Sequence, residues 1–269
     1  MSHDFVTIEK PRPGIAVVKL NRPERMNAMA FDVMVPLKEA IEAVSFDNTV
    51  RVVILTGEGE GFCSGADLKD PGYLSIFDGL TMPGIARRAM RVLDDALLAI
   101  QEMHQPVIAA VNGAAIGGGF CLSLMADIRV ASEKAYFRAA GINNGLTAAE
   151  LGLSYLLPRA VGASRSSEIM LTGRDVDAQE AERIGLVSRT VSADTLMDTC
   201  YQMAESIMQH SQIGVELTKQ MLWASQSASS LRTHINHEGH AQLFVRMTTK
   251  NFEEAIQARK EKRKPEFKD

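Results

Sequence analysis

The sequence predicts an α/β fold with a largely parallel sheet, followed by a helical C-terminal region. Short apolar runs alternate with stretches of helical spacing, and glycine-rich turns follow several of these runs. Such alternation favours parallel strands joined by right-handed crossovers. From Ala193 to about Ala258, in contrast, the spacing is almost only helical. We therefore expect a core over residues 1–192 and a helical region over 193–269.

The composition excludes several classes of protein. The 269 residues suffice to bury a sizeable core, and the hydrophobic content of 46% is that of an ordinary globular protein. A net charge of −4 argues against nucleic acid or an anionic membrane surface as the main partner. No apolar run is long enough to span a membrane, and the N-terminus lacks a signal-peptide pattern. Three cysteines without metal-ligand spacing indicate reduced thiols, so we expect a cytoplasmic protein.

The first part of the chain predicts a hairpin, a helix and a buried strand. Residues 5–9 and 15–20 are expected to pair, because two prolines and a glycine separate them. Apolar residues recur at helical spacing over 27–44, where Pro36 interrupts or kinks the helix. Residues 51–56 form an apolar run typical of a buried strand.

The middle of the chain continues this alternation. A loop with four glycines is expected over 57–70, and an irregular stretch over 71–83. A helix is predicted over 86–103, and strands over 107–111 and 127–131.

The segment PVIAAVNGAAIGGGFC, residues 106–121, predicts a strand, a turn, a glycine triplet and a helix. Three glycines at a helix start leave backbone N–H groups uncovered, at the positive end of the helix dipole. Such a place can hold an anion or the oxygen of a polarised carbonyl. The alternative is that the glycines only allow close packing of the helix on the sheet.

The C-terminal third predicts packing surfaces. Asp177 and Glu180 have the spacing of a capping box, which opens a short helix ending at Gly185. A short strand is expected over 186–191. The methionine-rich helices that follow favour adaptable packing over cofactor binding, and the charged C-terminal end is expected to be solvated.

Several familiar sites are excluded, and one metal site is disfavoured. The chain has no P-loop, no GxGxxG and no HExxH. His234, His237 and His240 recur every third residue, and this spacing drifts around a helix by roughly 60° per step. We expect a surface or interface face there, and no metal.

Two glycine-rich segments remain as candidate ligand sites. Ser64-Gly65-Ala66-Asp67-Leu68 and Gly117-Gly118-Gly119 each follow a predicted strand at its carboxyl end, where open α/β sheets bind ligands. Two N–H donors that converge on one oxygen would make an oxyanion hole.

These segments resemble the crotonase family, also called the enoyl-CoA hydratase/isomerase superfamily. The resemblance covers almost the whole chain and is carried by GFCSGADL and by PVIAAVNGAAIGGGFCLSLMADIRVAS, with support from residues 21–29, 171–191 and 253–267. It implies a crotonase-like spiral of ββα turns, with a C-terminal region that builds homotrimers, often paired into hexamers. It also implies an acyl-CoA thioester of fatty acid metabolism as substrate, with coenzyme A as part of that substrate and no separate cofactor.

The resemblance also implies site residues. The N–H groups of Ala66 and Gly118 would polarise the thioester carbonyl and stabilise an enolate. Coenzyme A would lie along Arg25, Met26, Ala28, Ser64, Asp67 and Leu68, where Asp67 could instead serve the local turn. Asp70 and Tyr73 lie in the variable loop that covers the acyl chain in the family.

Both glutamates of the family's hydratases are missing. Cys121 stands at the first glutamate position and Gly141 at the second. A free thiol has a pKa of about 8.5 and does not easily replace a carboxylate. Hydration by two glutamates is therefore not expected.

Glu150 is the nearest remaining carboxylate in the sequence. Residues 144–152, NGLTAAELG, resemble the stretch where dienoyl-CoA isomerases of the family carry an aspartate, if one inserted residue is allowed. A buried carboxylate there would have a raised pKa, which suits proton transfer. The alternative is that Thr147 and Glu150 form only a capping box.

The expected function is therefore catalysis on an acyl-CoA through a thioester enolate, with Glu150 as acid and base in hydration or double-bond isomerisation. One base fits isomerisation better. Two alternatives stay open: an acyl-CoA-binding protein without turnover, and other enolate chemistry such as decarboxylation, thioester hydrolysis or carbon–carbon cleavage.

Overall fold

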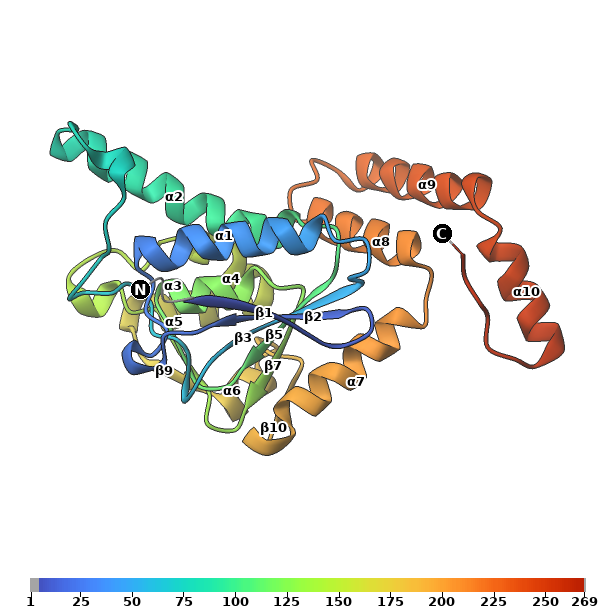
Figure 1. Ribbon diagram of the computed structural model, residues 1–269, viewed down its shortest axis with the longest axis horizontal. Helices are drawn as coiled ribbons and strands as arrows, with labels where there is room; N and C mark the ends of the chain where they lie inside the picture. Colours follow the sequence, from blue (N-terminus) through green and yellow to red (C-terminus); the bar gives the residue numbers. More distant parts are fainter. Residues whose placement is uncertain (1–4, 269) are drawn as a thin grey trace.

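Two β-sheets form the framework of the protein in the computed structural model, which describes residues 5–268 (Figure 1). The larger sheet has the order β1-β2-β3-β5-β7-β10, and the smaller sheet has the order β4-β6-β8-β9. The larger sheet contains β1 (Val6–Arg12), β2 (Ile15–Leu20), β3 (Val52–Gly57), β5 (Val107–Val111), β7 (Ile128–Ser132) and β10 (Arg189–Val191). The smaller contains β4 (Gly61–Cys63), β6 (Ala114–Ile116), β8 (Tyr136–Arg138) and β9 (Asp175–Asp177). Only β1–β2 and β8–β9 pair antiparallel among these strands of the described residues.

A ββα unit repeats along the chain. In each unit a strand of the larger sheet is followed by a short strand of the smaller sheet and then by a helix, as in β3-β4-α2, β5-β6-α3 and β7-β8-α4. The helices are α1 (Phe31–Ser45), α2 (Met82–Glu102), α3 (Gly118–Leu124), α4 (Leu153–Val161), α5 (Ala163–Thr172), α6 (Ala178–Arg183), α7 (Leu196–Met208), α8 (Gln212–Ser225), α9 (Leu231–Thr248) and α10 (Asn251–Glu261). The predicted α/β class and the spiral of ββα turns are both confirmed.

The larger sheet is buried on both faces. Along β2, Ile15 and Val17 belong to the apolar cluster under α7, whereas Ala16 and Val18 belong to the cluster under α1. Figure 1 shows α1 and α7 on opposite sides of this sheet. Burial on both faces explains why its strands are continuous apolar runs without alternation. A division at residue 192 would assign α7 to the C-terminal region. The buried side chains of α7, however, pack on the larger sheet.

The sequence missed the beginning of α1 and the short strands. Helix α1 begins at Phe31, not at residue 27, and runs through Pro36. The preceding residues are held in a non-helical path, because the Asn27 amide donates to the carbonyls of Glu58 and Gly61 and Met29 pairs with Ala66. Strands β4, β6 and β8 have three residues each, which is too short for a periodic pattern.

Helix boundaries elsewhere follow local signals. The Asp177 carboxylate accepts from the N–H of Glu180 at 2.8 Å, so the predicted N-cap of α6 is confirmed. Gly185 follows the end of α6 with a φ of 80°. Helix α2 begins at Met82, four residues earlier than the apolar spacing suggested, with Pro83 in its first turn. Strand β10 begins at Arg189, because the chain from Leu186 to Ser188 still turns away from α6.

The C-terminal helices differ in how firmly they contact the core. Helix α8 is fixed by Lys219, whose ammonium lies 3.0 Å from Asp127 Oδ2 and donates to the Gln105 carbonyl at 2.9 Å. Helix α9 has no buried residue over 18 positions. In Figure 1, α9 and α10 extend away from the two sheets. Among the described residues, no helix is both long and apolar enough to cross a membrane.

Candidate functional site

Two loops meet at the carboxyl ends of neighbouring strands. Strands β4 and β6 are parallel, and Cys63 pairs with Ala115. The loop that follows β4 contains Gly65 and Ala66, and the turn that follows β6 leads into α3 at Gly118. A methyl group on Gly65 would lie 3.4 Å from the Gly118 nitrogen, so the two loops are in contact. The predicted convergence of the two glycine-rich segments is therefore present.

The hydrogen bonds around Ala66 leave its own N–H unpaired. Met29 donates to the Gly65 carbonyl at 2.7 Å, and Asp67 donates to the Met29 carbonyl at 3.0 Å. This short parallel pairing engages the Gly65 carbonyl and the Asp67 N–H, which lie on either side of Ala66 in the chain. Gly118 is the first residue of α3, and a first helical N–H has no partner inside its helix. Within residues 5–268, no backbone hydrogen bond is formed by either N–H, so both can receive a substrate oxygen.

The glycine triplet serves close packing as well as exposure of N–H groups. A methyl group on Gly119 would lie 2.0 Å from the Cys63 carbonyl oxygen. Gly117 has a φ of 53°, which side chains rarely adopt, and its N–H donates to the Arg138 carbonyl at 2.8 Å. The close packing of the helix on β4 is therefore present, and the Gly118 N–H has no backbone partner among the described residues; the role of this N–H as an oxyanion donor stays a prediction.

Glu150 lies against the same turn. A methyl group on Gly117 would lie 3.3 Å from Glu150 Oε1, which places the carboxylate at the beginning of α3. The side chain is half-buried, and burial raises the pKa of this carboxyl. Within the described residues, no hydrogen bond or ion pair reaches the carboxylate. The carboxylate is therefore an uncompensated, half-buried acid beside the turn that leads into α3.

The capping box proposed as the alternative role of Glu150 is not formed. Thr147 Oγ1 accepts from the N–H of Ala149 at 3.0 Å, in a local turn. Helix α4 begins only at Leu153, with Gly152 as its N-cap and no side-chain cap. The helix start was misplaced because the left-handed conformations of Leu151 and Gly152, with φ of 43° and 86°, delay it.

Cys121 and Gly141, the two residues that the family resemblance aligns with hydratase glutamates, are both enclosed by the protein. The Cys121 thiol is fully buried and donates to the Glu150 carbonyl at 3.4 Å. Burial raises the pKa of the thiol, so it stays protonated. A methyl group on Gly141 would lie 2.1 Å from the Thr147 carbonyl oxygen, so the main chain occupies the space of a side chain there.

The residues expected along coenzyme A lie together at one edge of this site. The Ser64 hydroxyl donates to the Arg25 carbonyl at 3.3 Å, and the Ser64 N–H donates to the Met26 carbonyl at 3.0 Å. Ala28 is buried, whereas the side chains of Met26 and Leu68 are exposed. Asp70 and Tyr73 lie exposed in the segment that leads to α2.

Asp67 is different, because its carboxylate is engaged within the protein. The side chain is 2% exposed, accepts from Arg22 Nη1 at 3.1 Å, and forms an ion pair with Arg25. Burial works against the charge, but the hydrogen bonds from Arg25 and from the N–H groups of Asp70 and Lys69 lower the pKa of Asp67 to about 2. The carboxylate thus fixes two arginines and the turn that carries Ala66.

Sequence reasoning gave no role to Arg22, Asn27 or Met29, although all three lie in the NRPERMNAM stretch. Arg22 donates to Asp67, and the buried Asn27 amide donates to the carbonyls of Glu58, in the loop before β4, and of Gly61, the first residue of β4. The Met29 sulfur packs on Gly118, where a methyl group would lie only 2.4 Å from it. These roles depend on contacts 30 or more residues along the chain, which local spacing does not reveal.

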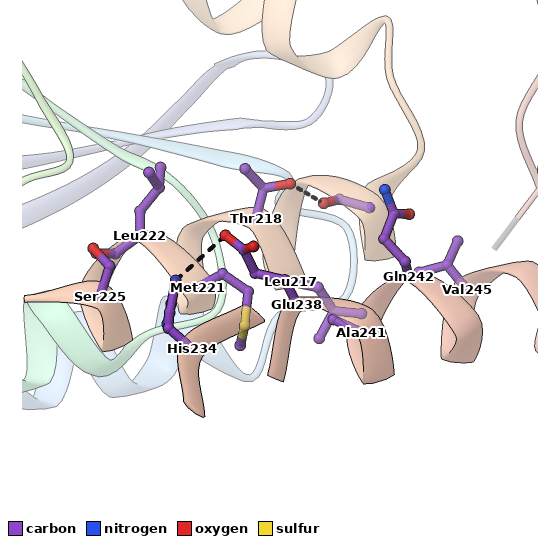
Figure 2. Close-up of a pocket in the computed structure, with 11 residues that line it drawn as sticks. Leu217, Thr218, Met221, Leu222, Ser225, His234, Glu238, Ala241, Gln242 and Val245 are labelled. Carbon is purple, nitrogen blue, oxygen red and sulfur yellow. Dashed lines mark hydrogen bonds and ion pairs between the residues drawn. The ribbon is translucent and has the colours of Figure 1, made fainter. Parts of the chain in front are cut away.

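His234 of α9 lines a separate groove, whereas His237 and His240 are not among the residues that line it. The groove lies between α8 and α9, has a volume of about 580 Å³ and is lined by none of the loop residues described above. Figure 2 shows the side chains that line it. His234 Nε2 lies 3.4 Å from Glu238 Oε1. In the part of the chain that the structure describes, no three histidine, cysteine or acidic side chains gather as metal ligands.

Comparison with known proteins agrees with this architecture. The family model for enoyl-CoA hydratase/isomerase matches residues 10–269. A Mycobacterium bovis relative named "probable enoyl-CoA hydratase" is 64% identical over 265 residues, which are 98% of this chain and 93% of the relative. A crystal structure of a "probable enoyl-CoA hydratase/isomerase" from Mycobacterium abscessus has a TM-score of 0.94 at 61% identity, covering 98% of both chains.

A second solved structure belongs to a protein with a more specific name. It is that of a monofunctional enoyl CoA isomerase from M. smegmatis, with a TM-score of 0.74 at 57% identity, covering 87% of this chain and 99% of that one. The match over nearly the whole chain and the two converging loops lead to one conclusion: this chain belongs to the enoyl-CoA hydratase/isomerase family, the crotonases.

Proposed function

We propose that the protein isomerises an enoyl-CoA, moving the double bond from the 3-position into conjugation with the thioester. One observation carries this proposal: Glu150 lies beside the oxyanion loops, while Cys121 and Gly141 stand at the two hydratase glutamate positions. A site with one base and an oxyanion hole can move a proton within a substrate.

The reaction needs only one proton carrier. The Glu150 carboxylate removes a proton from C2, and the C2–H electron pair moves toward the thioester oxygen. The N–H groups of Ala66 and Gly118 stabilise the resulting dienolate. Glu150 then returns the proton to C4, and the C2–C3 double bond forms. The carboxyl group is regenerated as a carboxylate, so no water or second base is consumed.

Hydration is disfavoured by the surroundings of Glu150. Adding water requires groups that hold the water and divide its proton and hydroxide between two carbons. The buried Cys121 thiol already donates to a carbonyl, and the Gly141 position is filled by the Thr147 main chain. The similarity to the M. smegmatis isomerase supports the same choice.

The exposed edge of the site suits the coenzyme A part of the substrate. Arg25 and Met26 border Ser64, and the side chain of Leu68, in the same loop as Ser64, is exposed. The proposed assembly is a homotrimer, or a hexamer of two trimers. It is supported by α9, which has no buried residue in one protomer, and by the apolar side chains that α9 and α10 expose.

Substrates with different double-bond positions test this proposal. With a 3-enoyl-CoA, we expect the absorbance of the conjugated thioester to rise while the product mass stays that of the substrate. With a 2-enoyl-CoA, we expect little of the hydrated product, whose mass would exceed that of the substrate by one water molecule. Rapid hydration without isomerisation would contradict the proposal, and tight binding without turnover would favour a binding protein. A changed mass with malonyl- or hydroxyacyl-CoA would favour other enolate chemistry.

A further inference from the structure

We propose that the turn Glu150–Leu151–Gly152 is a strained positioning device, in which Leu151 and Cys121 hold the Glu150 carboxylate against the first turn of α3. This inference rests on the proposed function, because it explains how the proposed base is aimed. Leu151 and Cys121 are positioning residues in this account, since they act through Glu150.

The backbone of Leu151 is the first observation. Its φ of 43° lies in the left-handed region, which a branched side chain rarely adopts. A residue in such a conformation persists only where its surroundings impose it, and such residues concentrate at functional sites. The turn places Glu150 immediately before this residue, so relaxation of Leu151 would rotate the Glu150 backbone.

Two contacts impose the conformation. The Leu151 side chain packs on α3, because a methyl group on Gly118 would lie 3.2 Å from Leu151 Cδ1. The Cys121 thiol, one turn further along α3, donates to the Glu150 carbonyl at 3.4 Å. The N–H of Leu153 donates to the same carbonyl at 2.8 Å. The turn is therefore attached to α3 at two points, the Glu150 carbonyl and the Leu151 side chain.

The size of Cys121 makes this attachment possible. At the position where hydratases of the family place a glutamate, a small buried thiol lets the 150–152 turn approach α3. A larger side chain would push the turn outward and move the carboxylate away from Gly117. In this proposal, the cysteine that stands in place of a hydratase glutamate also positions Glu150, the proposed base.

Four variants measured with a 3-enoyl-CoA test the inference. Leu151→Gly removes both the side-chain contact and the strain. Cys121→Ala removes the thiol donor, and Cys121→Ser restores a donor of similar size. Cys200→Ala is a matched control, because this buried thiol lies under α7 and away from the site. Circular dichroism and thermal unfolding establish that each variant folds.

We expect kcat to fall about 10- to 100-fold in Leu151→Gly, because a base displaced by an ångström loses much of its effectiveness. The KM should change less than kcat. The acid limb of the kcat–pH profile should move to lower pH, because a more solvated Glu150 loses the burial that raises its pKa. Cys121→Ala should show a smaller change in the same direction, which Cys121→Ser reverses.

Wild-type kcat and an unmoved acid limb in both Leu151→Gly and Cys121→Ala would overturn the inference. The Cys121 variants keep the test decisive if Leu151→Gly does not fold. Glu150→Gln separates the two claims. If that variant is active, the proposed function itself is wrong, whereas an inactive Glu150→Gln beside unaffected Leu151 and Cys121 variants removes only the positioning role.

Discussion

Glu150 carries its charge at a cost in stability. Burial disfavours the ionised form, and within the described residues no hydrogen bond or ion pair compensates its carboxylate. The folded-state pKa is therefore above the unfolded value of about 4.3. Between these two values the folded protein binds more protons than the unfolded chain, so stability falls as the pH rises through this window and stays lower above it.

This cost predicts that Glu150→Gln is more thermostable than the wild type at neutral pH. The amide keeps the shape of the side chain and removes the buried charge. We expect the difference in Tm to be largest above the folded-state pKa and to vanish below about pH 4, where both side chains are neutral. Thermal unfolding across pH measures it. Equal Tm values at neutral pH would show that the charge is not penalised.

Asp67 has the opposite electrostatic role. Its carboxylate pairs with Arg22 and Arg25 and has a pKa of about 2, below the unfolded value. Its contribution to stability is therefore fully present above the unfolded pKa of about 3.9. That contribution is lost as the pH falls toward the folded pKa.

Asp67→Asn should destabilise the fold by about 3 kcal/mol at neutral pH, because it leaves two arginines beside a buried neutral group. Denaturant unfolding provides the measurement. Glu24→Gln is the matched control, since Glu24 is 65% exposed and lies 3.9 Å from the same Arg22. A surface pair of this kind contributes about 0–1 kcal/mol. If the two variants lose the same stability, the buried pairing is not the source of the effect.

At the scale of elements, the approach of α3 to β4 determines how the N–H groups of Gly118 and Ala66, the proposed oxyanion donors, are placed relative to each other. Gly119 packs against the Cys63 carbonyl, with no room for a methyl group. Because β4 and β6 are neighbours in the smaller sheet, a shift of α3 would separate Gly118 from Ala66. The Cys63 carbonyl is part of the main chain of β4, so it cannot move aside for a methyl group as the end of a flexible side chain could.

Gly119→Ala is therefore expected to lower stability by a few kcal/mol, as overpacking in a core does, and to abolish turnover. Gly84→Ala is a suitable control, because a methyl group there meets only ordinary contacts, 3.6 Å or more away, in the first turn of α2. We expect it to be neutral or slightly stabilising, since alanine favours the helix. Unfolding curves and isomerase assays of both variants check this prediction, and an active Gly119→Ala would contradict it.

Elements with a periodic pattern could be predicted, and those fixed by distant contacts could not. The apolar runs of β3, β5 and β7 revealed the sheet because both of its faces are buried. The beginning of α1 depends on Asn27 and its bonds to the loop before β4, more than 30 residues away. In the candidate site, the two converging loops were visible as glycine motifs, whereas the position of Glu150 follows the left-handed conformation of Leu151, which no motif indicates.

On the scale of the whole molecule, the C-terminal helices expose apolar surface that a single chain does not cover. The side chains of Phe244 and Met247 on α9 are 52% and 81% exposed, and Phe252 and Ile256 on α10 are exposed as well. Large apolar side chains are typical of an interface where they gather into one exposed patch. Helix α8, which precedes α9 and α10 in the chain, is attached to the core by the ion pair between Lys219 and Asp127.

The double variant Phe244→Glu/Met247→Glu should convert the proposed trimer into monomers, because it places charges in an interface core. Sedimentation at micromolar concentration gives the mass of each species. Asn236→Glu, at an exposed polar position of the same helix, should keep the wild-type assembly. A monomeric wild type, or a double variant that remains assembled, would show that α9 does not form the interface.

The most direct test of the account compares wild type and Glu150→Gln with a 3-enoyl-CoA, following the absorbance of the conjugated thioester. Calorimetry with the same substrate shows whether binding is retained. If Glu150 is the single proton carrier, kcat falls roughly 10²- to 10⁴-fold in the variant, while the substrate still binds. Undiminished isomerisation by Glu150→Gln would contradict the account.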